Sequence, residues 1–506
     1  MLQGPGDCRG RAGRGPARHP IGRRRGPLRP AAPARLCRHS PSSLPLRVVL
    51  IRDRENRPLS RRPITLSRQA LRLRADAPCA RRSHRHAYAA GRKDGQAVRV
   101  RRLFAMRNRQ SMRSWLAALL AVAAMLLAMW IVIPAPHRAL LRFGVGAPEV
   151  SAWIMLLAAV ALVIALRDVR VRWTSRWAGI FALGALILSA LPFLQFGAQA
   201  QLAETSLRAA LGAQYATRFS PTQTSLLRPK PLIVADLFRG LRAPAAGVRI
   251  TRNVAVVSPT GQQLRLDVYQ PPTAGPHPVL VQVYGGAWQR GEPANNAEFA
   301  SYIAAQGHVV FAIDYRHAPA FVFPAPVQDV QFMLSWIGAH AKEWDSDTSR
   351  LALIGRSAGA HLAMMAAYAV GAPRIRAVID YYGPVDLTEG YRTPPRPDPL
   401  NVRAVEEAFL GGTPDDMPAR YRAASPISLV TTQMPPTLLV YGGRDHIVEP
   451  RFGSMLAARL RAEGTTVVHL EIPWAEHAFD AVPHGPSNQL ALYVTERFLA
   501  WAMRAR

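Results

Sequence analysis

The sequence predicts an α/β fold, a mostly parallel sheet flanked by helices, preceded by an all-α transmembrane anchor. In the C-terminal half, short runs of branched apolar residues alternate with longer helical patterns, as in parallel sheets whose strands are joined by helices. One of these runs enters a helix through a Gly-x-Ser-x-Gly turn at residues 355–359. Upstream, three long apolar runs contain no charged residue, which is typical of membrane-spanning helices.

Composition divides the 506 residues into four parts. Residues 1–105 hold 27 Lys and Arg against 5 Asp and Glu and are rich in Pro and Gly. Because they lack an apolar period, we expect them to be disordered and to form no core. Residues 106–200 are predicted to form the anchor, residues 201–245 a linker or cap segment, and residues 246–506 the C-terminal α/β domain.

The basic segment has several interpretations. Its charge suits a nucleic-acid-binding tail, but aromatic residues are not interleaved with the basic ones, so we expect no nucleic-acid partner. Pro and Gly would break the amphipathic helix of a transit peptide. The favoured hypothesis is that translation starts at Met106, where basic residues precede an apolar run, and that residues 1–105 are not made.

The anchor is predicted to consist of three helices, at residues 115–134, 150–166 and 177–196. At about 1.5 Å per residue each spans roughly 25 to 30 Å, close to the thickness of the hydrocarbon layer. A buried core helix is the alternative for the shortest run, and a cleaved signal peptide is the alternative for the first.

Basic residues near the ends of these runs predict the orientation. They are dense before the first run and between the second and third, namely at Arg107, Arg109, Arg113, Arg167, Arg170, Arg172 and Arg176. This pattern puts the N-terminus in the cytoplasm and the C-terminal domain outside. The three cysteines, Cys8, Cys37 and Cys79, all precede Met106, so the rest of the chain tolerates an oxidising compartment.

The segment of residues 201–245 begins with an amphipathic stretch. Leu202, Leu207 and Leu211 recur near helical spacing. A lid over a site, a helix lying on the membrane and a simple stalk all fit this pattern.

The turn at Gly355–Gly359 is the strongest local signal in the chain. An apolar strand that feeds a helix through Gly-x-Ser-x-Gly is the nucleophile-elbow pattern. The turn is so tight that Gly355 and Gly359 must lack bulk, and Ser357 is held clear of the sheet. The alternative is an ordinary strand-to-helix turn with Ser357 as the N-cap.

A serine nucleophile also requires hydrogen-bond donors for the oxyanion that forms when it attacks a carbonyl. The buried strand that begins at Pro278 ends in Gly285, Gly286 and Ala287, where small residues let the backbone approach a substrate. We predict the backbone N–H groups of Gly286, Ala287 and Ala358 as these donors.

The base and the orienting acid are expected downstream of the serine, in the order Ser, Asp, His. Asp445 follows the buried strand that begins at Thr437, and His477 lies in the loop after the strand of residues 467–472. These residues and the serine all follow strand ends, where open α/β sheets place their sites. We therefore predict Ser357, Asp445 and His477 as a catalytic triad.

Several neighbouring residues compete for these roles. Asp386 and Glu476 are the rival acids, and His484 is the rival base. We expect Glu476 and Asp480 to be solvated, His361 and His446 to be packing or rim residues, and His469 to lie in the middle of a strand.

The stretch from about Val279 to the C-terminus resembles the bacterial esterase/lipase branch of the α/β-hydrolases, which includes hormone-sensitive-lipase-like and feruloyl-esterase-like carboxylesterases. The matching pieces are YGGAW, AIDYRHAPAFVFPAPVQDVQFMLSWI, LALIGRSAGAHLA, YYGPVDL, ASPISLV, PPTLLVYGGRDHIV and AEHAF. The resemblance implies the α/β-hydrolase fold, a serine carboxylesterase that works through an acyl-enzyme, and, with the anchor, a location in the bacterial inner membrane.

The sequence departs from the family pattern around the oxyanion loop. Tyr284 stands where the family usually has histidine, Ala287 replaces a third glycine, and Arg356 precedes the serine. Tyr284, Trp288 and Arg356 are therefore predicted to bind substrate, with Arg356 favouring a negatively charged or polar group near the mouth.

The resulting prediction is a membrane-anchored esterase that acts on a small-molecule or lipid ester, with no metal and no cofactor. A serine peptidase or amidase of the same fold is the alternative enzyme, because the triad does not separate ester from amide chemistry. A non-catalytic membrane sensor or scaffold is the alternative from another class. Acyl chain length, alcohol and oligomeric state stay open.

Overall fold

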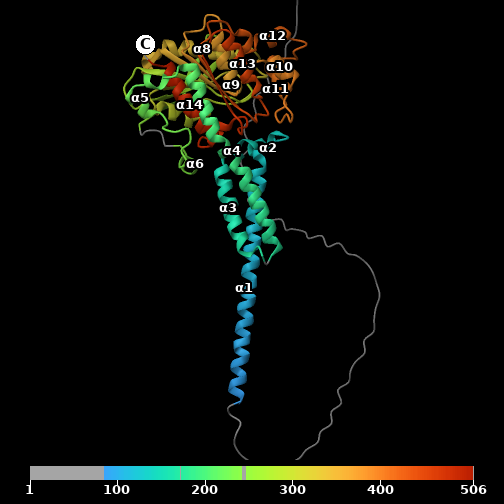
Figure 1. Cartoon of the computed structure of the whole chain (residues 1–506). Coiled ribbons are helices and arrows are strands. Elements are labelled where there is room, and N and C mark those ends of the chain that lie inside the picture. The colour runs from blue at the N-terminus through green and yellow to red at the C-terminus, as the bar shows by residue number, and fades with distance from the viewer. Residues whose placement is uncertain (1–84, 171, 242–246, 505–506) are drawn as a thin grey trace, which may run out of the picture. The chain divides into compact units, whose positions relative to one another are not determined.

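The computed structural model describes residues 85–170, 172–241 and 247–504 (Figure 1). The predictions for residues 1–84, including the three cysteines, lie outside the described residues. Helix α1 (Arg85–Ala128) begins ahead of the boundary expected at Met106, so the end of the basic segment is helical. The side chains from Ala97 to Ala105 are exposed on that helix and add nothing to a core.

Among the described residues, three helices are long and apolar enough to cross a membrane: α1, α3 (Ser151–Asp168) and α4 (Trp173–Leu211). They contain most of the three apolar runs identified in the sequence, although the first run, 115–134, continues past the end of α1 at Ala128. A short 3-10 turn, η1 (Met129–Ile131), and helix α2 (Arg138–Glu149) connect α1 to α3.

The three long helices bury small residues and expose large ones. Their buried positions are mostly alanines, namely Ala117, Ala121, Ala124 and Ala128 on α1, Ala158, Ala161 and Ala165 on α3, and Ala178, Ala182 and Ala185 on α4. Leu119, Ile187 and Leu194 face outward. Alanine contacts let helix backbones approach closely, and an apolar outer surface suits a lipid environment.

Helix α4 continues from the apolar run into the C-terminal domain. Ala203, Leu207 and Leu211 pack in the core of that domain, whereas Leu202 is 58% exposed. The prediction that Leu202 shares the apolar face was wrong, because the buried face follows positions 203, 207 and 211. The helix runs unbroken to Leu211, so the start of the 201–245 segment is helical.

The remaining part of the 201–245 segment forms short elements, η2 (Tyr215–Arg218), α5 (Pro221–Leu226) and α6 (Asp236–Arg239). Arg228 fastens this segment to the domain. Its guanidinium pairs with Asp236 at 3.1 Å and donates to Gln489 at 2.8 Å, and its backbone N–H donates to Glu496 at 2.6 Å.

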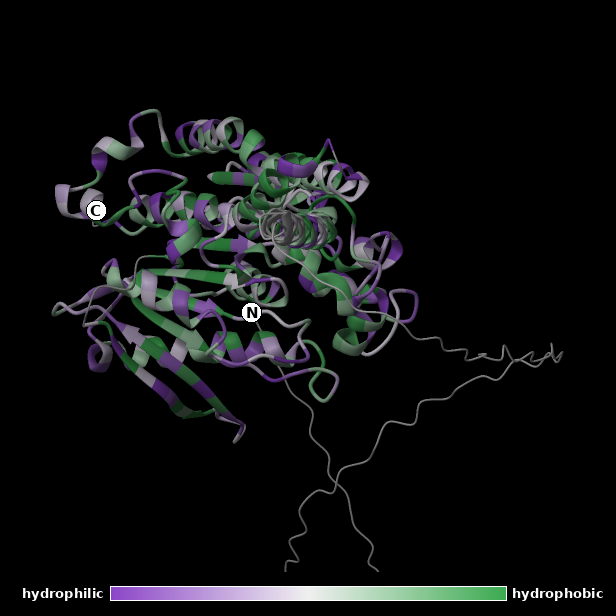
Figure 2. Cartoon of the chain, turned by 90° about the horizontal axis from the view of Figure 1, so that it is seen from below, coloured by the Kyte–Doolittle hydropathy of each residue, from purple (hydrophilic) through white to green (hydrophobic). Residues whose placement is uncertain are grey.

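The C-terminal domain contains one eight-stranded sheet in the order β1-β2-β4-β3-β5-β6-β7-β8. The strands from β3 onward are mutually parallel, and β1 and β2 form an antiparallel edge. Hydrophobic residues are concentrated in the strands (Figure 2). The strands are β1 (Arg249–Val257), β2 (Gln263–Gln270), β3 (His277–Val283), β4 (Val309–Ile313), β5 (Ser346–Arg356), β6 (Ala377–Tyr381), β7 (Thr437–Gly442) and β8 (Val467–Ile472).

Helices flank this sheet, as the sequence predicted (Figure 1). They are α7 (Ala297–Ala305), α8 (Ala325–Ala339), α9 (Ala358–Tyr368), α13 (Arg451–Ala462) and α14 (Pro486–Ala502). A longer excursion between β6 and β7 contains α10 (Leu387–Arg392), α11 (Val402–Leu410), α12 (Pro418–Ala423) and η4 (Pro426–Leu429). Two further 3-10 turns, η3 (Ala341–Trp344) and η5 (Phe479–Ala481), complete the domain.

Helix α2 docks on the domain through Glu149. Its Oε2 accepts a hydrogen bond from the backbone N–H of Ser487 at 3.1 Å, and a Cβ at Gly485 would lie only 2.2 Å from that oxygen. Burial raises the pKa of Glu149 to about 8. The connector between α1 and α3 is thus packed against the segment that joins β8 to α14.

Candidate active site

The turn between β5 and α9 holds Ser357 in a backbone conformation that residues other than glycine rarely adopt, with φ 53° and ψ −124°. Two close approaches explain why glycines flank it. A Cβ at Gly355 would lie 2.3 Å from the Cα of Ala360, and one at Gly359 would lie 2.2 Å from the carbonyl oxygen of Tyr284. The sharp turn therefore depends on packing that only glycine permits at both positions.

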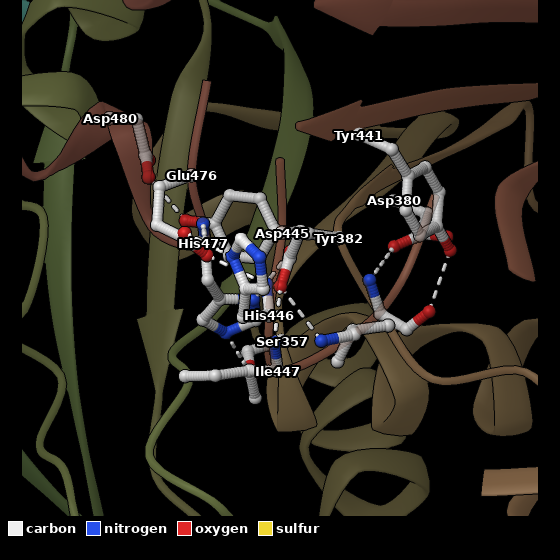
Figure 3. A network of polar contacts seen from close by, with 12 residues as sticks. Ser357, Asp380, Tyr382, Tyr441, Asp445, His446, Ile447, Glu476, His477 and Asp480 are labelled. Carbon is white, nitrogen blue, oxygen red and sulfur yellow. Dashed lines mark hydrogen bonds and ion pairs between the residues drawn. The ribbon is translucent and has the colours of Figure 1, made fainter. Parts of the chain in front are cut away.

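Ser357 lies within hydrogen-bond distance of a histidine that is itself bound to a carboxylate (Figure 3). The Oγ of Ser357 is 3.0 Å from Nε2 of His477, and Nδ1 of His477 is 2.7 Å from Oδ2 of Asp445. The other carboxylate oxygen of Asp445 accepts from the backbone N–H groups of Ile447 and Val448, both at 2.8 Å. The structure thus brings together the three residues predicted as a triad.

The electrostatics of this group favour a basic histidine. His477 and Asp445 are both buried. Burial by itself lowers the pKa of His477, but the charge and hydrogen bond of Asp445, with smaller contributions from Glu476 and Asp480, together raise it above the ordinary value. Asp445 therefore fixes the imidazole and favours its protonated form.

Two further carboxylates surround His477, and both are buried. The expectation that Glu476 and Asp480 are solvated was wrong. Glu476 accepts hydrogen bonds from the backbone N–H groups of His446 and His477, at 2.7 and 3.0 Å, and from the His446 ring at 2.7 Å. Asp480 binds the hydroxyl of Tyr382, whose ring centroid lies 4.6 Å from that of His477.

The other residues weighed as alternatives lie elsewhere. Asp386 caps helix α10 by accepting from the backbone N–H of Glu389 at 3.1 Å. His361 is buried, accepts from the Trp288 indole N–H at 3.2 Å and is 2.7 Å from the carbonyl of Ala424. His446 is half-buried beside Glu476, as a rim residue would be.

The loop after β3 carries two of the three predicted oxyanion donors, Gly286 and Ala287, and the third, Ala358, begins helix α9. Gly286 has φ +142°, and a Cβ there would lie 2.0 Å from the carbonyl oxygen of Arg290. Ala287 and Trp288 both adopt the left-handed region, at φ 57° and 58°. Consecutive strained residues of this kind are found where a backbone group must point at a ligand. Ala287, Ala358 and Ser357 line the same cavity.

Tyr284 braces this loop and does not line the cavity. Its ring is buried and stacks on Tyr315 at 4.5 Å, and its hydroxyl binds Asp314 and lies 2.9 Å from Nε2 of His317. The Tyr315 hydroxyl in turn donates to the carbonyl of Tyr284 at 3.1 Å. The prediction of Tyr284 as a substrate-binding residue was wrong. The side chain that replaces the family's histidine binds Asp314 and packs on Tyr315, and it does not reach the cavity.

Arg356 is also internal, with 3% of its surface exposed. It pairs with Asp480 and lies over the rings of Phe299 and Tyr381, at 4.4 and 5.4 Å. The prediction that it binds substrate at the mouth was wrong. Side chains alternate along strand β5, and the buried Asp480 holds this guanidinium away from the cavity.

The cavity beside Ser357 has about 530 Å³ of empty space, counted with its opening to solvent. Trp288 forms part of its wall, as predicted, and stacks on Phe409 at 4.3 Å. Most other lining residues come from the β6–β7 excursion and from the loop after β7: Pro384, Gly390, Thr393, Pro395, Leu400, Val402, Val405, Glu406, Ile447, Val448 and Phe452. No described residue of the 201–245 segment lines it, so the lid, one of the three interpretations of that segment, has no support among the lining residues.

Sequence reasoning missed this excursion. The long interval between the strands at Tyr381 and Thr437 was the available signal, because direct connections in such folds are shorter. The alternation of apolar and charged residues over 402–410 also has helical spacing.

The chain is similar in sequence to known carboxylesterases. Residues 266–460 match the family model described as BD-FAE. The chain is 30% identical over 225 residues to the carboxylesterase NlhH of Mycobacterium tuberculosis. This alignment covers 42% of the chain and 70% of that protein. It is 34% identical over 239 residues to the esterase LipC and 30% identical over 256 residues to the probable carboxylic ester hydrolase LipM of the same organism.

The alignments to LipC and LipM cover 44% and 47% of this chain and 59% and 58% of those relatives, so the chain spans about three fifths of their length. Among solved structures, a bacterial heroin esterase matches 57% of the chain and 99% of its own length, at 24% identity and a TM-score of 0.47. The esterase LipW of Mycobacterium marinum matches 56% and 96%, at 23% identity and a TM-score of 0.44.

Replacing Gly359 by alanine is expected to disrupt the elbow, because the new Cβ would meet the carbonyl oxygens of Val283 and Tyr284 at 2.3 and 2.2 Å. Gly338→Ala is the matched control, since it lies on helix α8 with nothing within 4 Å of an added Cβ. We expect Gly359→Ala to lower the thermal unfolding temperature of the domain. Gly338→Ala should leave it unchanged or raise it, as alanine is favoured by up to about 1 kcal/mol in helices. Equal effects of the two substitutions would contradict the packing argument.

Replacing Glu476 by glutamine is expected to lower the pKa of His477, because the nearby negative charge helps to raise it. A histidine base must be neutral, so hydrolysis should fail as the pH falls through this pKa. In Glu476→Gln the acidic limb of kcat/KM should therefore move to lower pH. Glu343→Gln, an exposed charge on η3, is the control and should leave it in place. An acidic limb that does not move, or moves upward, in Glu476→Gln would refute this account.

Proposed function

The chain belongs to the carboxylesterases of the α/β-hydrolase fold, and from this membership we propose that it is a membrane-anchored serine esterase. The observation that carries the proposal is the hydrogen-bonded series Ser357, His477, Asp445 at the floor of a mostly apolar cavity. Family membership favours ester over amide substrates, since the relatives are named as esterases.

In the first half of the proposed reaction, the Oγ of Ser357 attacks the ester carbonyl while Nε2 of His477 accepts its proton. Asp445 holds the proton on Nδ1 of His477 and stabilises the imidazolium that forms. The carbonyl oxygen becomes negatively charged and binds the backbone N–H groups of Gly286, Ala287 and Ala358. His477 then protonates the leaving alcohol, and the acyl group stays on Ser357.

In the second half, water replaces the alcohol. His477 removes its proton as it attacks the acyl-enzyme, the same N–H groups hold the second oxyanion, and proton return to Ser357 releases the acid. In related chemistry the loss of a single oxyanion donor costs about 10² to 10³ in turnover. The strained backbone at Ala287 and Trp288, which line the cavity with Ser357, supports this assignment, because such conformations are concentrated at active sites.

The anchoring part of the proposal rests on how α1, α3 and α4 pack, with small side chains between the helices and large apolar side chains facing outward. Exposed leucine and isoleucine side chains cover these helices while alanines fill their contacts, an arrangement that water would not stabilise. Arg172 donates to the carbonyl of Arg107 at 3.2 Å, so the two arginine-rich regions share one end of the bundle. We propose that this end faces the cytoplasm and that the hydrolase domain lies outside the bacterial inner membrane.

The catalytic assignment predicts hydrolysis of p-nitrophenyl acetate and butyrate by the purified full chain in detergent. Ser357→Ala should lower kcat on the order of 10⁴ to 10⁶, as for other serine hydrolases that lose the nucleophile. Ser335→Ala, an exposed serine of α8, should retain full activity. Equal activity of wild type and Ser357→Ala would show that Ser357 is not the nucleophile.

The anchoring assignment is tested by single-cysteine labelling in spheroplasts, after replacement of Cys8, Cys37 and Cys79 by serine. Thr273→Cys, in an exposed loop of the hydrolase domain, should react with a membrane-impermeant maleimide. Gln110→Cys, exposed on α1, should react only after permeabilisation. The opposite labelling pattern would reverse the orientation, and release of the protein by carbonate washing would exclude the anchor.

A further inference from the structure

One acidic side chain lines the cavity beside Ser357. Glu406, on helix α11, has 3% of its surface exposed, and the other side chains of the excursion that line the cavity are mainly aliphatic. Its Oε2 is fully buried without a hydrogen-bond partner. Within the described ranges, no ion pair or hydrogen bond involves either oxygen of Glu406.

The surroundings of Glu406 leave space for its carboxyl group but provide no hydrogen-bond partner for it. A Cβ at Gly390 would lie 2.7 Å from Oε1, so the absence of a side chain on α10 admits the group. Arg451, next to Phe452 of the cavity wall, is already bound to Glu389 at 2.6 Å and Glu449 at 2.8 Å. The charged group that acts on Glu406, Asp386, is itself acidic.

Buried polar groups are nearly always hydrogen-bonded, because an unpaired one retains the full cost of leaving water. Each exception requires an explanation, and in the wall of a substrate cavity a ligand can supply the missing partner. An unpaired carboxyl group in the wall of a substrate cavity fits this description.

Resting on the proposed function, we propose that Glu406 determines specificity by hydrogen-bonding an uncharged polar group of the ester substrate. The substrate class is an ester whose acyl or alcohol chain is aliphatic and carries a hydroxyl or carbonyl group. The aliphatic lining from Leu400, Val405 and Ile447 packs on the chain, and the carboxyl group of Glu406 receives its polar group.

The protonation state of the group explains the choice of an uncharged partner. Burial, with a smaller contribution from Asp386, raises the pKa of Glu406 well above its ordinary value. The neutral carboxyl group offers one O–H donor and one carbonyl acceptor, which match a hydroxyl group in both directions. A cationic substrate group would require the buried acid to ionise first.

The test compares matched esters by pH-stat titration with the full chain in detergent. The acyl pair is methyl hexanoate and methyl 6-hydroxyhexanoate, and the alcohol pair is pentyl acetate and 5-hydroxypentyl acetate. Methyl 6-aminohexanoate supplies the cationic arm. The measured quantity is the ratio of kcat/KM within a pair, which does not depend on the fraction of each preparation that is folded.

We expect the wild type to prefer the hydroxy ester by about tenfold or more in at least one pair, as hydrogen-bonding sites reject analogues that leave them unpaired. Glu406→Leu should abolish or reverse that preference, and Glu406→Gln should retain it. No hydroxyl preference in the wild type, or one that survives in Glu406→Leu, would overturn the proposal. Preference for the amino ester over the hydroxy ester, lost in Glu406→Gln, would also overturn it in favour of an ionised carboxylate.

Failure of the underlying esterase assignment gives a different result. In that case the wild type would hydrolyse none of the plain esters, or Ser357→Ala would hydrolyse them equally. Hydrolysis that depends on Ser357 but shows no hydroxyl preference would remove only the role of Glu406.

Discussion

The close contact between the start of α9 and the end of β3 supports the whole site. Gly359 lies against the carbonyl oxygens of Val283 and Tyr284, and the backbone N–H of Ser357 donates to the carbonyl of Tyr381 on the neighbouring strand at 2.9 Å. This contact fixes the serine relative to the loop that carries Gly286 and Ala287. Because Ser357 follows β5 and this loop follows β3, two adjacent parallel strands, the sheet itself sets the distance between the proposed nucleophile and the proposed oxyanion donors.

The proposed anchor contacts the segments that hold the rest of the site. Gln199 of α4 donates to the carbonyl of Glu471, the Phe196 and Trp474 rings lie 5.8 Å apart, and Arg444 donates to the carbonyl of Val132. With Glu149 against Gly485, these contacts reach the segments that carry Asp445 and His477. The helices proposed to lie in the membrane therefore help to hold the acid and the base of the proposed reaction.

The sequence was sufficient where a local rule determines the structure. Glycines on both sides of Ser357, and strands that end at Asp445 and before His477, follow from turn sterics and from the geometry of parallel sheets. It was insufficient where a side chain's environment depends on distant segments. Arg356 pairs with Asp480, which lies more than a hundred residues away, and Tyr284 binds Asp314 and His317, so neither partnership has a local signal. Glu406 was overlooked for the same reason, since its burial depends on α10.

The central claim is that His477 and Asp445 make Ser357 a nucleophile. Its most direct measurement is peptide mapping by mass spectrometry after incubation of the full chain with diethyl p-nitrophenyl phosphate, which phosphorylates activated serines. The account predicts one diethylphosphoryl group, on the peptide that contains Ser357, and its loss in His477→Gln. Modification of another serine, or unchanged labelling of Ser357 in His477→Gln, would contradict it.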